Sequence, residues 1–400
     1  MNLIDGLPVF GTHDENTLAQ LRDVASRAER VALMADGHLG YIMPVGGVAA
    51  YRGKVSVAGV GFDIACGNAA IRTNLAYEQI APHRAELADL IQSTISFGMG
   101  RTNKADDAPL DDPMFEDATW DAIGDQNTRV SLREKARHQL GTVGSGNHYV
   151  DVMVDENGTV WVGVHFGSRG FGHGVATATM AVAAGLRWSD RVKEHEALLP
   201  LDSSLGDAYW ALMSLAGHYA YVGREWVTRK VVSLIGGTEQ ELVHNHHNFA
   251  WKETHDGQEY VVVRKGATPA FPGQRGFVGG SMGDDAVIVE GVAEGGEPQR
   301  AAMFSTVHGA GRVMSRTEAK GKVKKGRVVR VGRVTAEMME AWLTERDVVL
   351  RGGGLDESPH AYRRLPDVLA AQGATVRVLH TLKPIIVVMA GADEFDPYKD

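Results

Sequence analysis

The sequence predicts an α+β fold, one large domain of mixed sheets with surrounding helices. Hydrophobic residues make up 44% of the 400 residues and charged residues 23%, which is the balance of a globular chain. Short strand-like runs separated by glycines alternate with helical runs, as in mixed α+β packing. No Pro/Ser-rich linker, composition break or internal repeat divides the sequence, so we expect a single domain over residues 1–400.

The N-terminal half begins with apolar residues at helical spacing and then changes to short strands. Leu18, Leu21 and Val24 recur three residues apart, which predicts an amphipathic helix over residues 16–31. A Pro- and Asp-rich stretch at 103–125 predicts a surface loop, and Asn157-Gly158 marks a hairpin turn. Elsewhere in this half we expect helices at 84–96 and 130–140, and strands at 31–34, 55–60, 69–75, 148–154 and 159–164.

The C-terminal half repeats this mixture of helices and strands. Apolar spacing predicts helices at residues 174–187, 207–235 and 362–372. Short apolar runs predict strands at 260–264, 287–291, 328–331, 375–379 and 385–389.

Charge and composition exclude several classes of protein. The formal net charge is −9, so bulk positive charge cannot bind nucleic acid, and phosphates would have to meet local basic clusters. The single cysteine, Cys66, excludes an intrachain disulfide. No apolar run of about 18 residues and no cationic leader is present, so we expect a cytosolic protein without membrane contact. Glycine is abundant, with 48 copies gathered in clusters beside polar residues.

Several of these clusters carry side chains that bind metals. Asp63 and Cys66 lie three residues apart in a glycine-flanked turn, so both could face one ion, although a free cysteine is more often a small buried residue. His148 and His165 also adjoin glycine turns, and in His244-Asn-His-His-Asn248 the spacing alone favours His244 and His247 on one helix face. One Asp, one Cys and three His suit Mn, Zn or Fe better than Ca or Mg.

A second motif, His308-Gly-Ala-Gly-Arg312, combines a histidine with glycines that admit a ligand and an arginine that can hold a phosphate through two hydrogen bonds. It is not a P-loop, and the glycine-rich residues 276–283 lack the strand–helix setting of a dinucleotide fingerprint. A basic stretch follows, which is either a solvated loop or a surface that contacts phosphates. Its members are Arg312, Arg316, Lys320, Lys322, Lys324, Lys325, Arg327, Arg330 and Arg333.

In their residues and in their order along the chain, these motifs resemble those of the RtcB family of GTP-dependent RNA-splicing ligases. The resemblance spans nearly the whole chain. It rests on residues 36–40, 61–67, 141–148, 165–170, 246–248, 264–267, 280–283 and 308–316. It implies that the α+β domain contains a central cleft for metal and nucleotide.

The resemblance also implies roles for individual residues. Two Mn(II) ions would be bound by Asp63, Cys66, His148, His165 and His247, with the Cys66 thiolate bridging them, so the family pattern selects His247 over His244. His308 would be the nucleophile that becomes linked to GMP. Tyr362 would stack on guanine. The full set implied for the nucleotide is Asn147, Asp151, Asn248, Ser281, Gly309, Ala310, Gly311, Arg312 and Tyr362.

The implied reaction has three steps. His308 attacks the α-phosphorus of GTP and expels pyrophosphate, as expected for a neutral imidazole nucleophile. An RNA 3′-phosphate, formed by opening of a 2′,3′-cyclic phosphate, then takes the GMP, and a 5′-hydroxyl displaces GMP to close the phosphodiester. The implied partners are GTP, RNA ends from tRNA splicing or RNA repair, and an archease-type activating protein.

Three positions depart from the family pattern. Phe166 replaces a serine, Asp151 replaces a glutamate, and Met389 replaces a C-terminal lysine that contacts guanine. A thioether cannot donate a hydrogen bond, so we expect weaker discrimination between GTP and ATP unless Lys383 or Lys399 compensates.

Two alternatives to a ligase remain open, a metal-dependent RNA end-processing phosphodiesterase and a non-ligating RNA-binding paralogue. The retained His308 motif argues against the first, and the intact set of metal ligands argues against the second.

Overall fold

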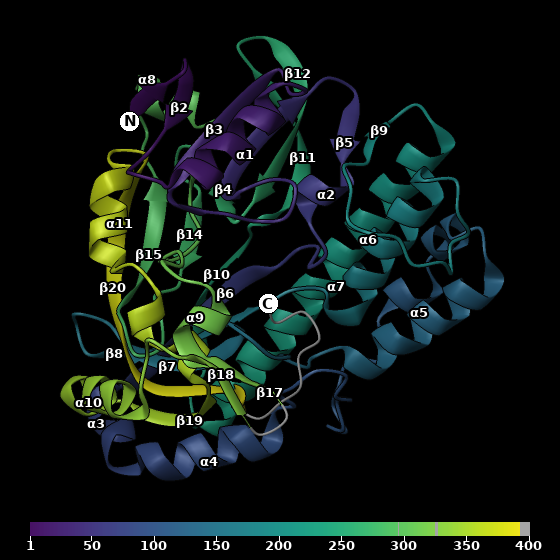
Figure 1. The fold of residues 1–400 in the computed structure, drawn as a ribbon. Helices are drawn as coiled ribbons and strands as arrows, with labels where there is room; N and C mark the ends of the chain where they lie inside the picture. Colours follow the sequence, from purple (N-terminus) through teal and green to yellow (C-terminus); the bar gives the residue numbers. More distant parts are fainter. Residues whose placement is uncertain (295, 325–326, 393–400) are drawn as a thin grey trace.

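Two large sheets organise the chain (Figure 1). The structure is a computed structural model that describes residues 1–294, 296–324 and 327–392. Within these ranges the strands of the first sheet lie in the order β1 (Asn2–Ile4), β2 (Leu7–Val9), β3 (Arg30–His38), β4 (Val45–Tyr51), β12 (Gln258–Lys265) and β11 (Asn248–His255). Those of the second lie in the order β10 (Glu239–His246), β6 (Gly67–Ala76), β8 (Thr159–Phe166), β7 (Tyr149–Val154), β20 (Val376–Gly391), β15 (Ala286–Gly291) and β14 (Arg275–Val278), with β19 (Val349–Gly353) parallel to β20.

Short strands also form small ribbons outside the two sheets. The described pairs are β5 (Lys54–Ser56) with β9 (Leu198–Pro200), β13 (Ala267–Pro269) with β16 (Ser305–Val307), and β17 (Gly321–Lys324) with β18 (Arg327–Val331).

Helices cover the sheets on several sides. In Figure 1, α5 (Gln126–Gln139), α6 (Arg169–Ala183) and the long α7 (Ser204–Leu234) lie together at the right, and α7 packs on β6 and β8. The helices α1 (Glu15–Ala25) and α11 (Leu365–Gln372) pack on β3, and α4 (Arg84–Thr94) packs on β20. The remaining described helices are α2 (Val57–Val60), α3 (Tyr77–Ile80), α8 (Glu297–Ala301), α9 (Arg316–Lys320), α10 (Ala336–Arg346), η1 (Ala81–His83), η2 (Pro113–Glu116), η3 (Ala118–Ala122), η4 (Leu355–Glu357) and η5 (Pro359–Ala361). Among the described residues, no helix is both long enough and apolar enough to cross a membrane.

The register of the second sheet brings distant histidines together. His165 near the end of β8 lies opposite Asn68 of β6 on one side and Tyr149 of β7 on the other. His246, the last residue of β10, pairs with Gly67, which directly follows Cys66. The core below these strand ends is rich in buried valines, so the sheet forms a rigid support for the polar residues at its edge.

The predicted α+β class is confirmed, but several predicted boundaries were wrong. The helix expected to Val31 ends at Ala25, because Arg30 already begins the buried strand β3. The strand expected over 55–60 ends at Ser56, whose hydroxyl caps the single turn α2 by accepting a hydrogen bond from the Gly59 amide at 2.8 Å.

Three further corrections concern the loop at 103–125 and the C-terminal elements. The loop contains the short helices η2 and η3 and buries Met114, Phe115 and Trp120 in the main core, so it is more than a surface connection. The helix expected from Tyr362 begins at Leu365. The two strands expected at 375–379 and 385–389 form one strand, β20, whose pairing with β7 is irregular next to Pro384, where the backbone lacks a donor.

Candidate metal and nucleotide site

A cavity of about 320 Å³ opens where the ends of both sheets meet. Every residue predicted to bind metal or nucleotide or to act as the nucleophile lines it. These residues are Asp63, Cys66, His148, His165, His247, His308, Asn147, Asp151, Asn248, Ser281, Gly309, Ala310, Gly311, Arg312 and Tyr362. The sequence motifs therefore converge on one place in the fold.

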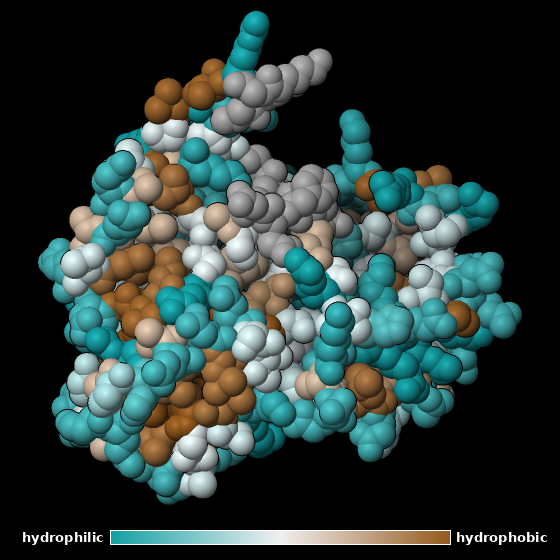
Figure 2. Space-filling model, turned by 90° about the horizontal axis from the view of Figure 1, so that it is seen from below, coloured by the Kyte–Doolittle hydropathy of each residue, from teal (hydrophilic) through white to brown (hydrophobic). Residues whose placement is uncertain are grey.

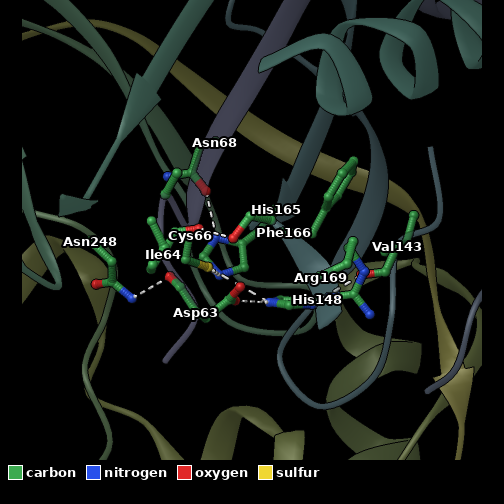
Figure 3. Close-up of polar contacts among 12 residues, drawn as sticks. Asp63, Ile64, Cys66, Asn68, Val143, His148, His165, Phe166, Arg169 and Asn248 are labelled. Carbon is green, nitrogen blue, oxygen red and sulfur yellow. Dashed lines mark hydrogen bonds and ion pairs between the residues drawn. The ribbon is translucent and has the colours of Figure 1, made fainter. Parts of the chain in front are cut away.

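Of the predicted metal ligands, Cys66, His148, His165 and His247 are buried and Asp63 is half-buried. Figure 3 shows Asp63, Cys66, His148 and His165 side by side. The Cys66 Sγ atom lies 3.7 Å from His148 Nε2 and 3.5 Å from His165 Nε2. Asp63 Oδ2 lies 3.1 Å from the same His148 nitrogen. Ligand atoms of Cys66, His148 and His165 all lie within 4.8 Å of one another, which is close enough for one ion to contact all three.

Hydrogen bonds on the far side of each ring fix the orientation of two of these histidines. His165 Nδ1 lies 2.6 Å from Asn68 Oδ1, and the amide group of Asn68 donates to the Phe277 carbonyl. His148 Nδ1 lies 3.0 Å from the Val143 carbonyl. The Asn68 oxygen is an acceptor, so Nδ1 of His165 carries the proton and its Nε2 is left as a ligand atom, the usual arrangement behind a metal-binding histidine. His148 Nδ1 also lies 3.2 Å from Arg169 Nη1, a donor, and its Nε2 faces Asp63, so these contacts orient the ring without assigning its proton.

The charge states in the cluster suit a metal. Burial alone would raise the pKa of Asp63, but the hydrogen bond and charge of His148 and the charge of Arg169 lower it to about 2. Burial lowers the pKa values of His165 and His247 well below their ordinary range, so both rings are neutral. Burial and the charge of Asp63 raise the pKa of Cys66, so the thiol must release its proton when a metal binds.

The donor set fits a borderline transition metal. His247 Nδ1 is buried and has no hydrogen-bond partner among the described residues, and the His247 ring centroid lies 5.0 Å from that of His165. Thiolate, imidazole and carboxylate together are typical of Mn, Zn or Fe sites. That the site holds two ions, and that they are Mn(II), stays a prediction.

Next to this cluster lies His308, held by Asp36. The fully buried Asp36 carboxylate accepts hydrogen bonds through Oδ2 from the amides of His308 and Gly309, at 2.9 and 3.2 Å. The same oxygen lies 2.6 Å from His308 Nδ1, an ion-pair contact whose angles are not those of a hydrogen bond. Sequence reasoning gave Asp36 no role, although it begins the first motif, because nothing in the sequence connects two residues so far apart.

Arg312 is engaged by the protein itself. Its Nη1 donates to the Tyr362 hydroxyl at 2.8 Å and its Nη2 to the Asp356 carbonyl at 2.7 Å, while its guanidinium lies 4.8 Å from the centre of the Tyr362 ring. Tyr362 also donates to Glu357. Arg312 therefore positions Tyr362, and it would have to exchange these partners to hold a phosphate through two hydrogen bonds.

One part of the cavity wall is apolar. Met282, Val387 and Met389 pack together there, and β20 places Val387 beside Asp151 of β7. Asp151 Oδ1 and Ser281 Oγ are buried without a partner in the described chain, so both are available to a ligand. Lys383 is not among the described residues that line the cavity, and Lys399 lies outside the described residues.

A second cavity, of about 550 Å³, adjoins the first. The two share Asp63, Asn147, His148, Asn248, Lys265 and Arg316. Lys135, Arg169, Lys265 and Arg316 give its wall a basic character. The sequence contained no spacing that predicted this second cavity.

Two predictions about individual clusters need correction. His244 and His247 do not share a helix face, because His244 lies within strand β10, where its Nε2 accepts a hydrogen bond from Arg224 at 2.8 Å. The basic stretch is not one surface, because Arg316 and Lys320 pair with Asp356, at 3.3 and 3.5 Å. Lys325 and the side chain of Lys324 lie outside the described part of the chain.

Comparison with known proteins agrees with this geometry. The family described as tRNA-splicing ligase RtcB matches residues 17–390. The RNA-splicing ligase RtcB of Escherichia coli K12 is 32% identical over 387 residues, which cover 90% of each chain. The tRNA-splicing ligase RtcB of Thermococcus kodakarensis is 32% identical over 409 residues, covering 84% of this chain and 82% of the relative. The RNA-splicing ligase RtcB of Mycobacterium tuberculosis is 31% identical over 427 residues, covering 88% of this chain and 95% of the relative.

Proposed function

Because the chain belongs to the RtcB family of RNA-splicing ligases, we propose that it joins an RNA 3′-phosphate or 2′,3′-cyclic phosphate end to a 5′-hydroxyl end through a histidine–GMP intermediate. The observation that carries this proposal is the contact of the buried Asp36 with His308, which lines the same cavity as the metal-ligand cluster. A metal-dependent phosphodiesterase would need the metal ligands, but it would not need a histidine such as His308 oriented to act as a nucleophile.

In the first step, the Asp36 carboxylate keeps the proton of His308 on Nδ1, so that Nε2 has a free electron pair. Nε2 forms a bond to the α-phosphorus of GTP, and the bond from that phosphorus to the bridging oxygen breaks, releasing pyrophosphate. The positive charge that develops on the imidazole is stabilised by Asp36, which the backbone amides of His308 and Gly309 hold in place.

Metal ions would assist this chemistry. Asp63, Cys66, His148, His165 and His247 are the residues that would hold them, and bound Mn(II) would supply positive charge against the phosphate oxygens. The His247 and His308 ring centroids are 4.9 Å apart, so the cluster lies beside the nucleophile.

The second cavity is the proposed site of the RNA ends. An oxygen of the RNA 3′-phosphate attacks the phosphorus of the histidine-bound GMP and the N–P bond breaks, which leaves a 3′ end carrying a pyrophosphate-linked guanosine. The 5′-hydroxyl oxygen then attacks the RNA phosphorus, loses its proton and displaces GMP. Lys135, Arg169 and Lys265 would neutralise the RNA phosphates during both steps. The proposed involvement of an archease-type activator rests on family membership alone.

The decisive experiment is to incubate the protein with GTP labelled at the α-phosphate and with Mn(II). We expect acid-labile label on the wild-type protein and none on His308→Ala. Asp36→Asn should form the adduct roughly tenfold or more slowly, because the amide cannot stabilise a charged imidazole as a carboxylate does. His380→Ala, which changes a histidine on β20 paired with Glu156, is the matched control and should label normally. Label that persists on His308→Ala would contradict the assigned nucleophile.

A further inference from the structure

We infer that Arg224 is a positioning residue that holds three ligand-bearing segments of the proposed metal site in register, an inference that rests on the proposed function. Arg224 lies on α7 and is completely buried. It does not line the cavity, so it would act through the ligands and not on the substrate.

Each of three hydrogen bonds ends one residue away from a predicted metal ligand. Arg224 Nη1 donates to the Ala65 carbonyl at 2.8 Å and to the Phe166 carbonyl at 2.6 Å. Its Nη2 donates to His246 Nδ1 at 2.8 Å. Ala65 precedes Cys66, Phe166 follows His165, and His246 precedes His247. One rigid guanidinium therefore connects the turn after α2, the end of β8 and the end of β10.

The turn at Ala65 explains why such a contact is needed. Ala65 has a φ of 60°, in the left-handed region that residues with a side chain rarely adopt. Its amide donates to the Asn248 carbonyl at 2.7 Å and its carbonyl accepts from Arg224, so contacts outside the turn hold this backbone in place. Arg224 thus adds to the backbone hydrogen bonds of Cys66 itself, whose amide donates to the Asp63 carbonyl at 3.0 Å and whose carbonyl accepts from the His247 amide at 2.9 Å.

The same guanidinium also excludes two histidines from the metal cluster. Arg224 donates to His244 Nε2 and His246 Nδ1, so both atoms are acceptors and both rings are neutral. None of these hydrogen bonds goes to a carboxylate, and a buried cation without a hydrogen-bonded anion usually costs folding free energy. We take this cost as a sign that Arg224 is retained for the geometry of the site.

The test uses Co(II) as the probe, because thiolate-bound Co(II) absorbs in the near ultraviolet and visible range. In Arg224→Lys the charge is kept but the planar fork is lost. We expect the Kd for Co(II) to rise at least tenfold and the thiolate absorption to weaken. Arg264→Lys is the matched control, since Arg264 is equally buried but bonds to Ser305, Glu253 and Met303 away from the cavity. It should lower Tm and leave Co(II) binding unchanged.

Circular dichroism and gel filtration show whether Arg224→Lys folds. If it does not, His246→Phe removes one acceptor but keeps an aromatic ring between Tyr221 and Phe249, and we expect several-fold weaker Co(II) binding. If Arg224→Lys folds, a wild-type Kd and spectrum in that variant would overturn the inference. If Arg224→Lys does not fold, the same result in His246→Phe would overturn it. So would a wild-type protein that binds no Co(II). Because these titrations contain no GTP or RNA, a failure of ligation gives a different result from a failure of this inference.

Discussion

Lys265 is a buried cation at the junction of the two cavities. Its Nζ atom donates to the Tyr41 carbonyl at 2.5 Å and lies 3.4 Å from the Ala58 carbonyl. Burial lowers the pKa of Lys265 to about 8, while the charges of Glu194 and Glu196 raise it by less. Lys265 is therefore mostly protonated at pH 7, at a cost to the folded state, and loses its charge in mildly alkaline solution.

This shift makes a testable prediction about stability. Between about pH 8 and 10.5 the unfolded chain binds more protons at Lys265 than the folded chain, so the free energy of unfolding rises with pH in this window. From pH 7 to 9.5 the wild type should gain roughly 1–2 kcal/mol relative to Lys265→Met, which lacks the titrating group. Urea unfolding of both proteins at the two pH values measures this difference. A difference that stays constant with pH would show that the pKa is not lowered.

Sequence reasoning identified the site residues that lie within motifs and missed those whose role depends on packing. Cys66, His165 and His308 stand out because chemically distinctive side chains adjoin glycine turns. Asp36 and Arg224 do not, because their partners come from distant strands and become visible only when the chain has folded. His244 was misjudged because helical spacing was assumed for residues that form a strand.

At the scale of elements, the ribbon β17–β18 extends the basic stretch beyond the cavity, beside α9 at the lower centre of Figure 1. Lys322, Arg327 and Arg333 are exposed, whereas Arg316 and Lys320 are paired with Asp356. Val328, Val329 and Val331 are also exposed, at 66%, 62% and 81%. The ribbon therefore presents cations without a stabilising core, which favours contact with RNA phosphates over a structural role.

Charge reversal tests this interpretation of the ribbon. Replacing Lys322, Arg327 and Arg333 with Glu should weaken the binding of single-stranded RNA and flatten its dependence on salt, by about 0.7 in slope for each lost phosphate contact. The measurement is a titration of 3′-phosphorylated RNA at several salt concentrations. The control reverses three exposed cations elsewhere, Lys54, Arg187 and Lys252. An equal salt slope in the ribbon variant and the wild type would mean that the ribbon is only solvated.

Secondary structure was easier to predict than the joins between elements. Valine-rich strands such as β8 and the long helix α7 follow their hydrophobic pattern closely. The sequence pattern could not show that residues 376–391 continue as one strand through Pro384, because an irregular pairing accommodates the proline. The helix α10 was also missed; its residues Met339 and Leu343 pack half-buried against the cluster of Met282, Val387 and Met389, and none of its residues is fully buried.

At the scale of the whole molecule, the chain carries a net negative charge, and several of its cations line the second cavity. Seen from below, the surface is mostly hydrophilic, with hydrophobic residues gathered in separate patches (Figure 2). With a formal net charge of −9, RNA would be repelled by most of the surface and attracted only where cations cluster, as around the second cavity. That residues 1–400 form one domain stays a prediction.

The cavity that contains His308 is built from distant parts of the chain, since β7, β20 and the loops around Ser281 and Tyr362 all contribute to it. At its apolar end, Met389 offers no hydrogen-bond donor to guanine O6 or N7. Burial raises the pKa of Asp151 well above its ordinary range, which favours the protonated form, and in that form the carboxyl group can donate as well as accept a hydrogen bond. Neither group therefore requires guanine in particular.

We accordingly expect ATP to compete with GTP for formation of the His308 adduct, and Met389→Lys to strengthen the preference for GTP. A lysine ammonium that reaches guanine O6 and N7 would contribute about 1–3 kcal/mol, or roughly fivefold to 150-fold in the ratio of adduct yields. Met282→Leu, a change of similar size in the same apolar cluster that adds no donor, should leave the ratio unchanged. The measurement is adduct yield with α-labelled GTP against α-labelled ATP in all three proteins. Strict use of GTP by the wild type would show that another group selects the base, most directly an Asp151 that ionises when guanine binds and accepts hydrogen bonds from it.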